Sequence, residues 1–396
     1  MLEPTGPEAL RVDPGSIQVT GSILVNSTNT TAARVYSGGS VTATGTIGGP
    51  RAPAGFVGSF NPTPTNRPAG TDPYSALILC PASPACPATP PTPYPSVIRS
   101  GGTATANPGV YRSIEVSSGG RLTLNPGTYV VTERLLVTGS GSRLTGTGVT
   151  IYLACSTYPT PCSANASGAF YANEAGATVT ISAPTTGAYS CLSLISDRNN
   201  AGQVRITGAG AATTAGGVYL RSAKLLVDTG SANLTRAVVD TVETKNSGAL
   251  LRIIPTGSLS VTVPGTRDYG STPPGQTISG LLGTVTVTDQ RCQTPSSWTA
   301  TVTATNLSTG GATGTISRSN VAYWSGQAVT TTGTGTFTPG QPTSAQAQSL
   351  GSPRTAFTVT GGDRNTTATW NPTLRITVPP GAVAGRYTGT ITHSVA

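Results

Sequence analysis

Apolar and polar residues alternate in short β-type runs along the first two thirds of the chain. Triplets such as Ile114-Glu115-Val116, Leu122-Thr123-Leu124 and Val204-Arg205-Ile206 place an apolar residue on each side of a polar or charged one. In an extended strand the two outer residues point to one face and the middle residue to the other. The runs recur roughly every 20 to 25 residues up to about residue 254, a period typical of solenoids. The pattern therefore predicts an all-β fold that begins with a right-handed parallel β-helix over residues 1–255, with coils of uneven length.

Residues 51–100 interrupt this pattern because proline is dense there. Proline cannot donate a hydrogen bond to a β-ladder, so regular strands are disfavoured through much of the segment. We expect an excursion from the solenoid at this point, closed by a disulfide between Cys80 and Cys86.

Beyond residue 255 the alternating runs become longer and more widely spaced. They cover residues 259–263, 283–288, 298–304, 356–360, 374–378 and 387–392. Several strands separated by turn-rich segments are typical of an antiparallel β-sandwich. We therefore predict a second domain of this kind over residues 256–396.

The charge composition excludes several classes of function. Charged residues make up only 9% of the chain, whereas about 25% is usual in soluble domains. The net charge of +9 comes from arginines scattered singly, with Lys224 and Lys245 as the only lysines. This distribution disfavours nucleic-acid binding, which needs clustered basic residues. No apolar stretch is long enough for a membrane span.

The cysteines indicate an oxidising compartment. Cys80 with Cys86, and Cys155 with Cys162, are separated by five and six residues, wider gaps than metal-binding pairs usually show. We predict a disulfide in each pair. Cys191 lies in an apolar run and is interpreted as a buried inert thiol rather than as one end of a long-range bridge.

Localisation follows from the same features. The chain begins Met1-Leu2-Glu3-Pro4, which is unlike a signal peptide. The paired cysteines nevertheless indicate an exported protein, so we expect a mature or truncated form that acts outside the cell or at its surface.

The chain contains few residues that could serve in catalysis. His393 is the only histidine and stands three residues from the end of the chain, and there are 14 carboxylates in 396 residues. In the solenoid the acids are spread singly, as Glu115, Glu133, Glu174, Asp197, Asp228, Asp240 and Glu243. Glycoside hydrolysis needs two carboxylates close together, and calcium needs several. We predict no enzyme activity, no metal and no cofactor; Asp240 and Glu243 are explained by a solvated face or a salt bridge to Lys245.

The solenoid half resembles secreted proteins associated with bacterial Tad-type pilus loci. The resemblance rests on Asn-Pro-Gly-x-Tyr at residues 107–111 and 125–129, Gly-Thr-Gly-Val-Thr-Ile-Tyr at 146–152, Ala-Pro-Thr-Thr-Gly-Ala-Tyr at 183–189 and Asp-Arg-Asn at 197–199. It covers roughly residues 15–255 and implies a secreted β-helix.

The last 140 residues resemble the WxL-like domains of Gram-positive surface proteins. The matching segments are residues 287–291 (Val-Thr-Asp-Gln-Arg), 297–302 (Ser-Trp-Thr-Ala-Thr-Val), 369–374 (Thr-Trp-Asn-Pro-Thr-Leu), 379–381 (Pro-Pro-Gly) and 385–395. The resemblance implies an exported sandwich in a Gram-positive-like cell wall that attaches to peptidoglycan or another surface polysaccharide. Neither Trp298-Thr299-Ala300 nor Trp370-Asn371-Pro372 is a literal Trp-x-Leu.

Four residues of this region are candidates for contact with a wall polymer or glycan: Trp298, Trp370, Asp289 and Arg291. Aromatic rings combine apolar area with a polar edge and can stack on sugars. Packing in the sandwich core is the alternative for the tryptophans, and an ion pair that fixes a turn is the alternative for Asp289 and Arg291.

The sequence thus favours an exported, non-enzymatic structural protein with a rigid β-helix spacer and a sandwich for attachment or assembly. Self-association into filaments is open to it because the ends of a solenoid leave unpaired strand edges. A carbohydrate-binding or carbohydrate-cleaving wall protein is the alternative. An ice-binding protein is a third possibility, suggested by Thr-x-Thr at residues 42–44 and 103–105, although the threonines do not recur at a constant period.

Overall fold

The computed structural model describes the chain except for residues 91, 165, 167 and 310–313, and except for the side chains of residues 293, 294 and 363. The regular secondary structure of the described residues is almost all β, with two short 3-10 helices, η1 (Arg318–Asn320) and η2 (Ser344–Gln346). The chain divides into two compact units, Met1–Thr256 and Gly257–Ala396. The division lies one residue from the boundary that the change of strand pattern predicts.

Unit 1 is built from a large parallel sheet of 20 strands, in which strands from successive chain segments form three ladders. The first ladder runs in the spatial order β10 (Val97–Ser100), β12 (Gly109–Ser117), β14 (Gly127–Thr138), β17 (Phe170–Glu174), β20 (Val204–Thr207), β21 (Ala211–Asp228), β22 (Ser231–Lys245), β1 (Leu10–Asp13), β4 (Ala33–Val35) and β7 (Phe56–Val57). The second ladder runs β11 (Thr103–Ala106), β13 (Arg121–Leu124), β15 (Arg143–Gly146), β18 (Thr178–Ser182), β21, β22, β23 (Leu250–Ile253), β2 (Gly15–Val19), β5 (Gly39–Ala43) and β8 (Phe60–Asn61). The third runs β12, β14, β16 (Val149–Leu153), β19 (Leu192–Ser196), β21 and β22. A separate parallel sheet holds β3 (Ile23–Leu24), β6 (Ile47–Gly49) and β9 (Thr65–Asn66).

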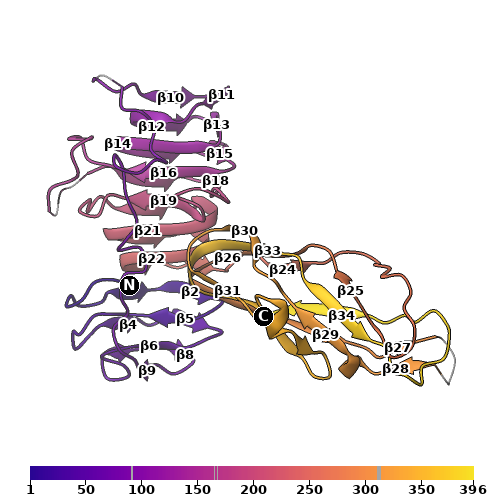
Figure 1. The fold of residues 1–396 in the computed structure, drawn as a ribbon. Helices are drawn as coiled ribbons and strands as arrows, with labels where there is room; N and C mark the ends of the chain where they lie inside the picture. Colours follow the sequence, from indigo (N-terminus) through magenta and orange to yellow (C-terminus); the bar gives the residue numbers. More distant parts are fainter. Residues whose placement is uncertain (91, 165, 167, 310–313) are drawn as a thin grey trace. The chain divides into compact units, whose positions relative to one another are not determined.

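The strands at one level of the three ladders form a rung, and successive rungs form a stack. The spatial order of the rungs in the stack differs from the order of their strands in the sequence. Strand β1 pairs with β22, and β2 pairs with β23, so the N-terminal strands follow the last strands of the unit. Figure 1 shows these indigo strands directly beside β22, while β10 and β11 lie at the far end of the stack. The chain therefore starts in the middle of the stack and forms one end of it with β7, β8 and β9. It then crosses to β10 at the opposite end, and the following strands lead back to the middle.

The core of unit 1 follows from the alternation in the sequence. Register partners such as Ile114, Leu135 and Tyr171 are buried together on the inner side of the first ladder, whereas Glu115 lies on the outer side. Apolar partners of this kind from the first, second and third ladders belong to one continuous cluster. Burial of apolar area, at about 25 cal/mol per Å², is the main force that holds the rungs together.

A second apolar cluster lies on the outer side of the third ladder. Every residue of β16 and of β19 is buried, as expected of strands covered on both faces. The outer cover comes from the proline-rich segment and from loops, through Tyr74, Cys80, Tyr94, Tyr158 and Tyr189. The excursion is therefore packed against the sheet.

The excursion is shorter than the predicted range of residues 51–100. Three strands, β7, β8 and β9, occupy positions between residues 56 and 66, and β10 begins at Val97. The structure thus limits the excursion to residues 67–96. The prediction was wrong at both ends because strands of only two residues fit between prolines, and because β10 lies beyond the last proline.

Unit 2 contains antiparallel sheets. The larger sheet has six strands, β24 (Leu259–Thr262), β26 (Val285–Ala304), β33 (Arg354–Trp370), β30 (Ala328–Thr332), β31 (Thr336–Pro339) and β35 (Ile391–Val395). A second sheet has four, β25 (Thr277–Leu281), β34 (Thr373–Thr377), β29 (Val321–Trp324) and β32 (Gln348–Ser349). Strands β27 (Leu307–Ser308) and β28 (Thr315–Ile316) form a small pair. The core of the unit draws on both larger sheets, for example Trp298 and Tyr323.

In the part of the chain that the structure describes, no helix has the length and apolar character needed to cross a membrane.

Candidate functional site

The two tryptophans proposed for glycan contact are buried in unit 2. Trp298 on β26 is 2% exposed, and its indole Nε1 donates to Thr366 Oγ1 at 3.0 Å. Trp370 on β33 is fully buried, and its Nε1 donates to the hydroxyl of Tyr323 at 3.1 Å. Neither ring reaches the surface, so neither can stack on a sugar in this structure.

Asp289 and Arg291 form a two-pronged ion pair within β26. The guanidinium Nε and Nη2 donate to the two carboxylate oxygens at 2.9 Å each, and Ser296 Oγ donates at 2.7 Å. Burial raises the pKa of Asp289, but the hydrogen bonds from Arg291 and Ser296 outweigh it and hold the pKa below its ordinary value. The carboxylate is saturated by partners of its own chain, which is the arrangement of an ion pair that stabilises a bend.

His393 on β35 lies among aromatic rings rather than beside an acid. Its Nε2 and the Tyr323 hydroxyl share a hydrogen bond at 3.2 Å, and its ring meets the Trp370 ring edge-on, with centroids 6.2 Å apart. Burial lowers the pKa of the imidazole to about 4. A neutral, buried imidazole of this kind is part of the core.

Several acids of unit 1 have a basic or hydroxyl partner within the unit. Glu115 pairs with Arg134 at 2.9 Å, Glu174 pairs with Arg205, and Asp197 accepts from the Tyr152 hydroxyl at 3.0 Å. No group of three or more His, Cys, Asp or Glu side chains that could hold a metal ion occurs among the described residues. Asp240 stands out because burial, aided by Glu3, raises its pKa to about 6.

Glu243 pairs with Lys224 and Arg11, at 2.9 and 3.5 Å. The predicted partner, Lys245, lies two positions further along the strand and is a register neighbour of Asp13. Lys224 and Arg11 lie on the strands that flank Glu243 in the first ladder, so pairing across the ladder explains the salt bridge.

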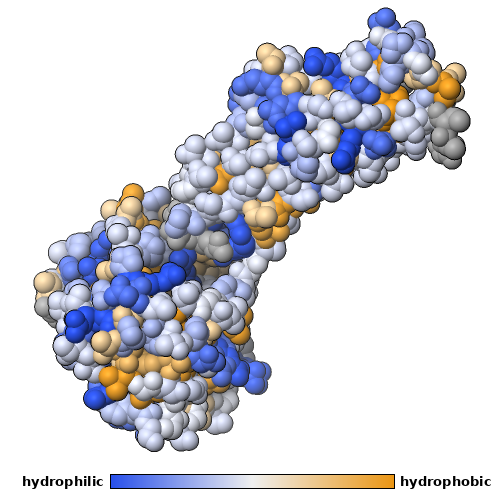
Figure 2. All heavy atoms as spheres, turned by 90° about the horizontal axis from the view of Figure 1, so that it is seen from below, coloured by the Kyte–Doolittle hydropathy of each residue, from blue (hydrophilic) through white to orange (hydrophobic). Residues whose placement is uncertain are grey.

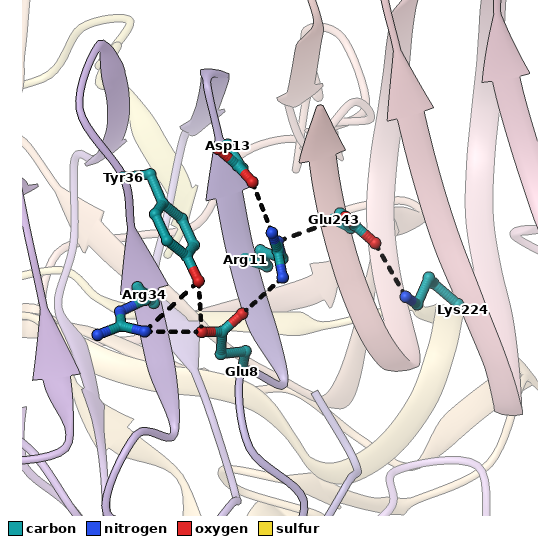
Figure 3. A network of polar contacts seen from close by, with 7 residues as sticks. All are labelled: Glu8, Arg11, Asp13, Arg34, Tyr36, Lys224 and Glu243. Atoms are coloured by element: carbon teal, nitrogen blue, oxygen red, sulfur yellow. Dashed lines mark hydrogen bonds and ion pairs between the residues drawn. The ribbon is translucent and has the colours of Figure 1, made fainter. Parts of the chain in front are cut away.

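A network of charged side chains covers the outer side of the first ladder where the N-terminal strands meet the last ones (Figure 3). Arg11 contacts Glu8 at 3.0 Å, Asp13 and Glu243, and its guanidinium lies 4.9 Å from the centre of the Tyr36 ring. Glu8 also accepts from the Tyr36 hydroxyl at 2.8 Å. Arg34 on β4 contacts Glu8 at 3.3 Å, and Lys224 on β21 pairs with Glu243. The network therefore spans β21, β22, β1 and β4 and connects the two parts of the stack.

A row of threonines lies on the outer side of the second ladder. Thr105, Thr123, Thr145, Thr180 and Thr213 are register neighbours on five consecutive strands. All but Thr145 are exposed, and the hydroxyls of Thr123 and Thr145 are 3.4 Å apart. Neighbouring strands lie about 4.8 Å apart, so the row is evenly spaced although its intervals in the sequence are unequal. The parallel row two residues earlier on each strand is mixed, and holds Thr103, Arg121, Arg143, Thr178 and Ala211.

The segment Asp197–Asn200 anchors the excursion and a disulfide loop to the third ladder. The Arg198 guanidinium donates to the carbonyls of Tyr74, Ser75 and Leu77 at 3.1, 3.0 and 2.7 Å. Asn199 Nδ2 donates to the Cys162 carbonyl at 2.9 Å. The anchoring role of Asp-Arg-Asn is not visible in the sequence, because the backbone carbonyl groups that accept these hydrogen bonds carry no sequence signal.

Two short disulfides join Cys80 to Cys86 and Cys155 to Cys162, with Cα atoms 5.7 and 5.4 Å apart. Cys191 and Cys292 are also disulfide-bonded, and the structure has no free cysteine among its described residues. The interpretation of Cys191 as an inert thiol was therefore wrong. It rested on the apolar run around Cys191, which reports burial and not oxidation.

In comparisons with known proteins, no family model matches the chain and no curated protein matches it.

Proposed function

We propose that unit 1 is a right-handed parallel β-helix and that unit 2 is an antiparallel β-sandwich. Long strands support the first part. Strand β21 contributes residues 211–214 to the second ladder, 217–220 to the third and 224–228 to the first, and β22 follows in the same order. Each turn of the chain thus visits the three ladders in one direction, as the coils of a solenoid do.

The protein then serves outside the cell as a non-enzymatic structural protein, with unit 1 as a rigid spacer. The observation that carries this proposal is the continuous apolar core shared by successive rungs, with ion pairs between neighbouring strands on the outer side of the first ladder. Such stacking resists bending because neighbouring strands are hydrogen-bonded along at least two ladders, and along three between β12 and β22. The disulfides fit an oxidising environment.

Unit 2 supplies attachment in this proposal, and peptidoglycan or another surface polysaccharide is the partner. The WxL-like resemblance supports the partner, but the contact must use residues other than Trp298 and Trp370, because both are core residues.

Co-sedimentation of the full chain with purified peptidoglycan tests the attachment, with cellulose as the matched insoluble control. We expect retention on peptidoglycan only, and no release of reducing sugar during incubation. Absence of retention would remove the attachment role. Released reducing sugar would instead favour the carbohydrate-cleaving alternative.

The threonine row favours a second candidate, binding to ice. Threonine offers a methyl and a hydroxyl group, and a flat parallel ladder repeats them at an even spacing, so the row can match a periodic array of water molecules. The arginines of the adjacent row confine the candidate surface to one line of residues, Thr105 to Thr213.

Partitioning of the protein into a growing ice front tests this candidate. Thr123→Tyr and Thr180→Tyr place bulky rings in the row and should abolish enrichment in ice. Thr207→Tyr is the matched control, because Thr207 lies on the first ladder. Exclusion of the unmodified protein from ice would end the candidate.

A further inference from the structure

The two ends of the stack in unit 1 expose strand edges that no other strand of the described chain pairs. One end consists of β7, β8 and β9, and the other of β10 and β11 together with the start of β12. An open edge is a template for pairing with another chain, and natural proteins protect such edges with short strands, prolines or inward-pointing charges.

The end with β7, β8 and β9 is protected by short strands. Each of the three contains two residues, and Pro62 and Pro64 interrupt the chain between β8 and β9. Phe56 and Phe60 pack edge to face, with ring centroids 5.6 Å apart, and close the core at this end. Figure 2 looks at this end from below and shows apolar side chains among hydrophilic ones.

The opposite end carries longer edge strands, and its protection is different. Strands β10 and β11 have four residues each. In β10 Val97 keeps the usual inward apolar position beside Ile114, but the next two residues depart from the pattern. Arg99 is the register neighbour of Val116, which is followed by Val137, and both valines are fully buried on the inner side. Ile98 takes the outer position and is 63% exposed.

Arg99 occupies an inward register position at the end of the stack and has no charged partner among the described residues. The structure places no ion pair on it among the described residues, and its Nε is buried with no hydrogen-bond partner. A Cβ built on Gly120 would lie 2.6 Å from the Arg99 carbonyl oxygen and 3.1 Å from Arg99 Cγ, so Gly120 allows both the backbone and the side chain of Arg99 to approach closely. A further rung stacked on β10 would seal this guanidinium inside an apolar column, where an unpaired charge is strongly unfavourable.

The charges at the two ends also oppose association. Residues 97–111 contain Arg99 and no acid, while residues 50–67 contain Arg51 and Arg67 and no acid. Stacking one end of the unit on the other would bring positive charges together, and no carboxylate in either segment would compensate them.

We propose that Arg99 is a gatekeeper residue that prevents the β10–β11 edge from pairing with a second copy of this chain. The filament growth that the sequence leaves open is thereby blocked, and unit 1 remains a single shaft. This inference concerns the end of the stack and stands apart from the proposed attachment and ice-binding roles.

Sedimentation velocity of the full chain tests the inference over a wide range of concentration. We expect the unmodified protein to remain monomeric and Arg99→Val to self-associate, with a dissociation constant lower by roughly tenfold or more. Valine continues the column of Val116 and Val137, so the variant should fold; Arg99→Ala provides the same test if it does not. Arg99→Lys keeps the inward charge and should remain monomeric.

Two controls separate edge pairing from a general loss of charge. Arg121→Val removes an exposed outward arginine on the next rung and should leave the protein monomeric. Because the Gly101 amide donates to Ser117 in the next rung, the amide of Ile98 points to the open edge, and Ile98→Pro should reverse the association of Arg99→Val. A folded but monomeric Arg99→Val would overturn the proposal, as would equal association of Arg121→Val or of the unmodified protein.

Discussion

Leu10 and Val242 are register neighbours in the first ladder, although most of unit 1 lies between them in the sequence. Both side chains are buried in the same apolar cluster. Their contact marks the seam at which the N-terminal strands join the last strands of the unit. The seam joins segments that are far apart in the sequence, and backbone hydrogen bonds and side-chain contacts both hold it together.

The first prediction concerns Arg11, the centre of the charged network at this seam. Arg11→Ala removes the contacts of Arg11 with Glu8, Asp13 and Glu243. We expect the free energy of opening the seam to fall by about 1 kcal/mol and no more, because ion pairs between partly exposed side chains contribute little. The rate of backbone amide hydrogen exchange should increase more in residues 10–66 than in residues 97–145. Arg112→Ala, which breaks an exposed pair with Glu133, is the control. An equal change in both regions would contradict the assignment of the network to the seam.

Arg198 gives a second prediction. Arg198→Ala removes three hydrogen bonds to the carbonyls of Tyr74, Ser75 and Leu77, which together should cost about 2 kcal/mol locally. Limited proteolysis should then cut the segment around residues 72–80 before any other site in unit 1. Arg205→Ala, which removes a pair with Glu174, should leave this segment protected. Unchanged cleavage in Arg198→Ala would show that the apolar cluster alone holds the excursion.

The Cys80–Cys86 disulfide supports a third prediction. Replacing both residues by serine frees a short loop and should lower the free energy of unfolding of unit 1 by about 2 kcal/mol. Urea unfolding followed by far-UV circular dichroism measures the change. The three tryptophans all lie in unit 2, so their fluorescence should show no shift in midpoint. A parallel shift in fluorescence would mean that the two units unfold together.

His393 makes the stability of unit 2 depend on pH. Its folded pKa of about 4 lies below the ordinary value of 6.5, so the unfolded chain binds more protons between these pH values. The contribution of neutral His393 to the free energy of unfolding of unit 2 is fully present above pH 6.5. It should fall by on the order of 3 kcal/mol as the pH drops to about 4. Tryptophan fluorescence during urea unfolding at several pH values measures this loss. His393→Phe should flatten the dependence in this window, and an unchanged slope would assign it to another group.

The β-content of the chain, the change of strand pattern near residue 255 and the pairing of Cys80 with Cys86 could be predicted from the sequence. This was possible because each depends on neighbours in the sequence: alternation, turn residues and short loops. The partners of Glu243 and the oxidised state of Cys191 could not be predicted, because both depend on residues that arrive from distant segments. For Trp298 and Trp370 the sequence left two interpretations open, a place in the core or contact with a glycan. The structure places both in the apolar core of unit 2, to which both larger sheets contribute.

The sequence by itself determined what each rung contains, since two apolar residues around a polar one specify which side of a strand is buried. Only the tertiary structure decided which rungs are neighbours. It placed β1 after β22 and brought Thr105, Thr123 and Thr145 into one row across unequal intervals. The physical reason is that parallel strands align by burial and backbone hydrogen bonds, which are indifferent to the length of chain that connects them.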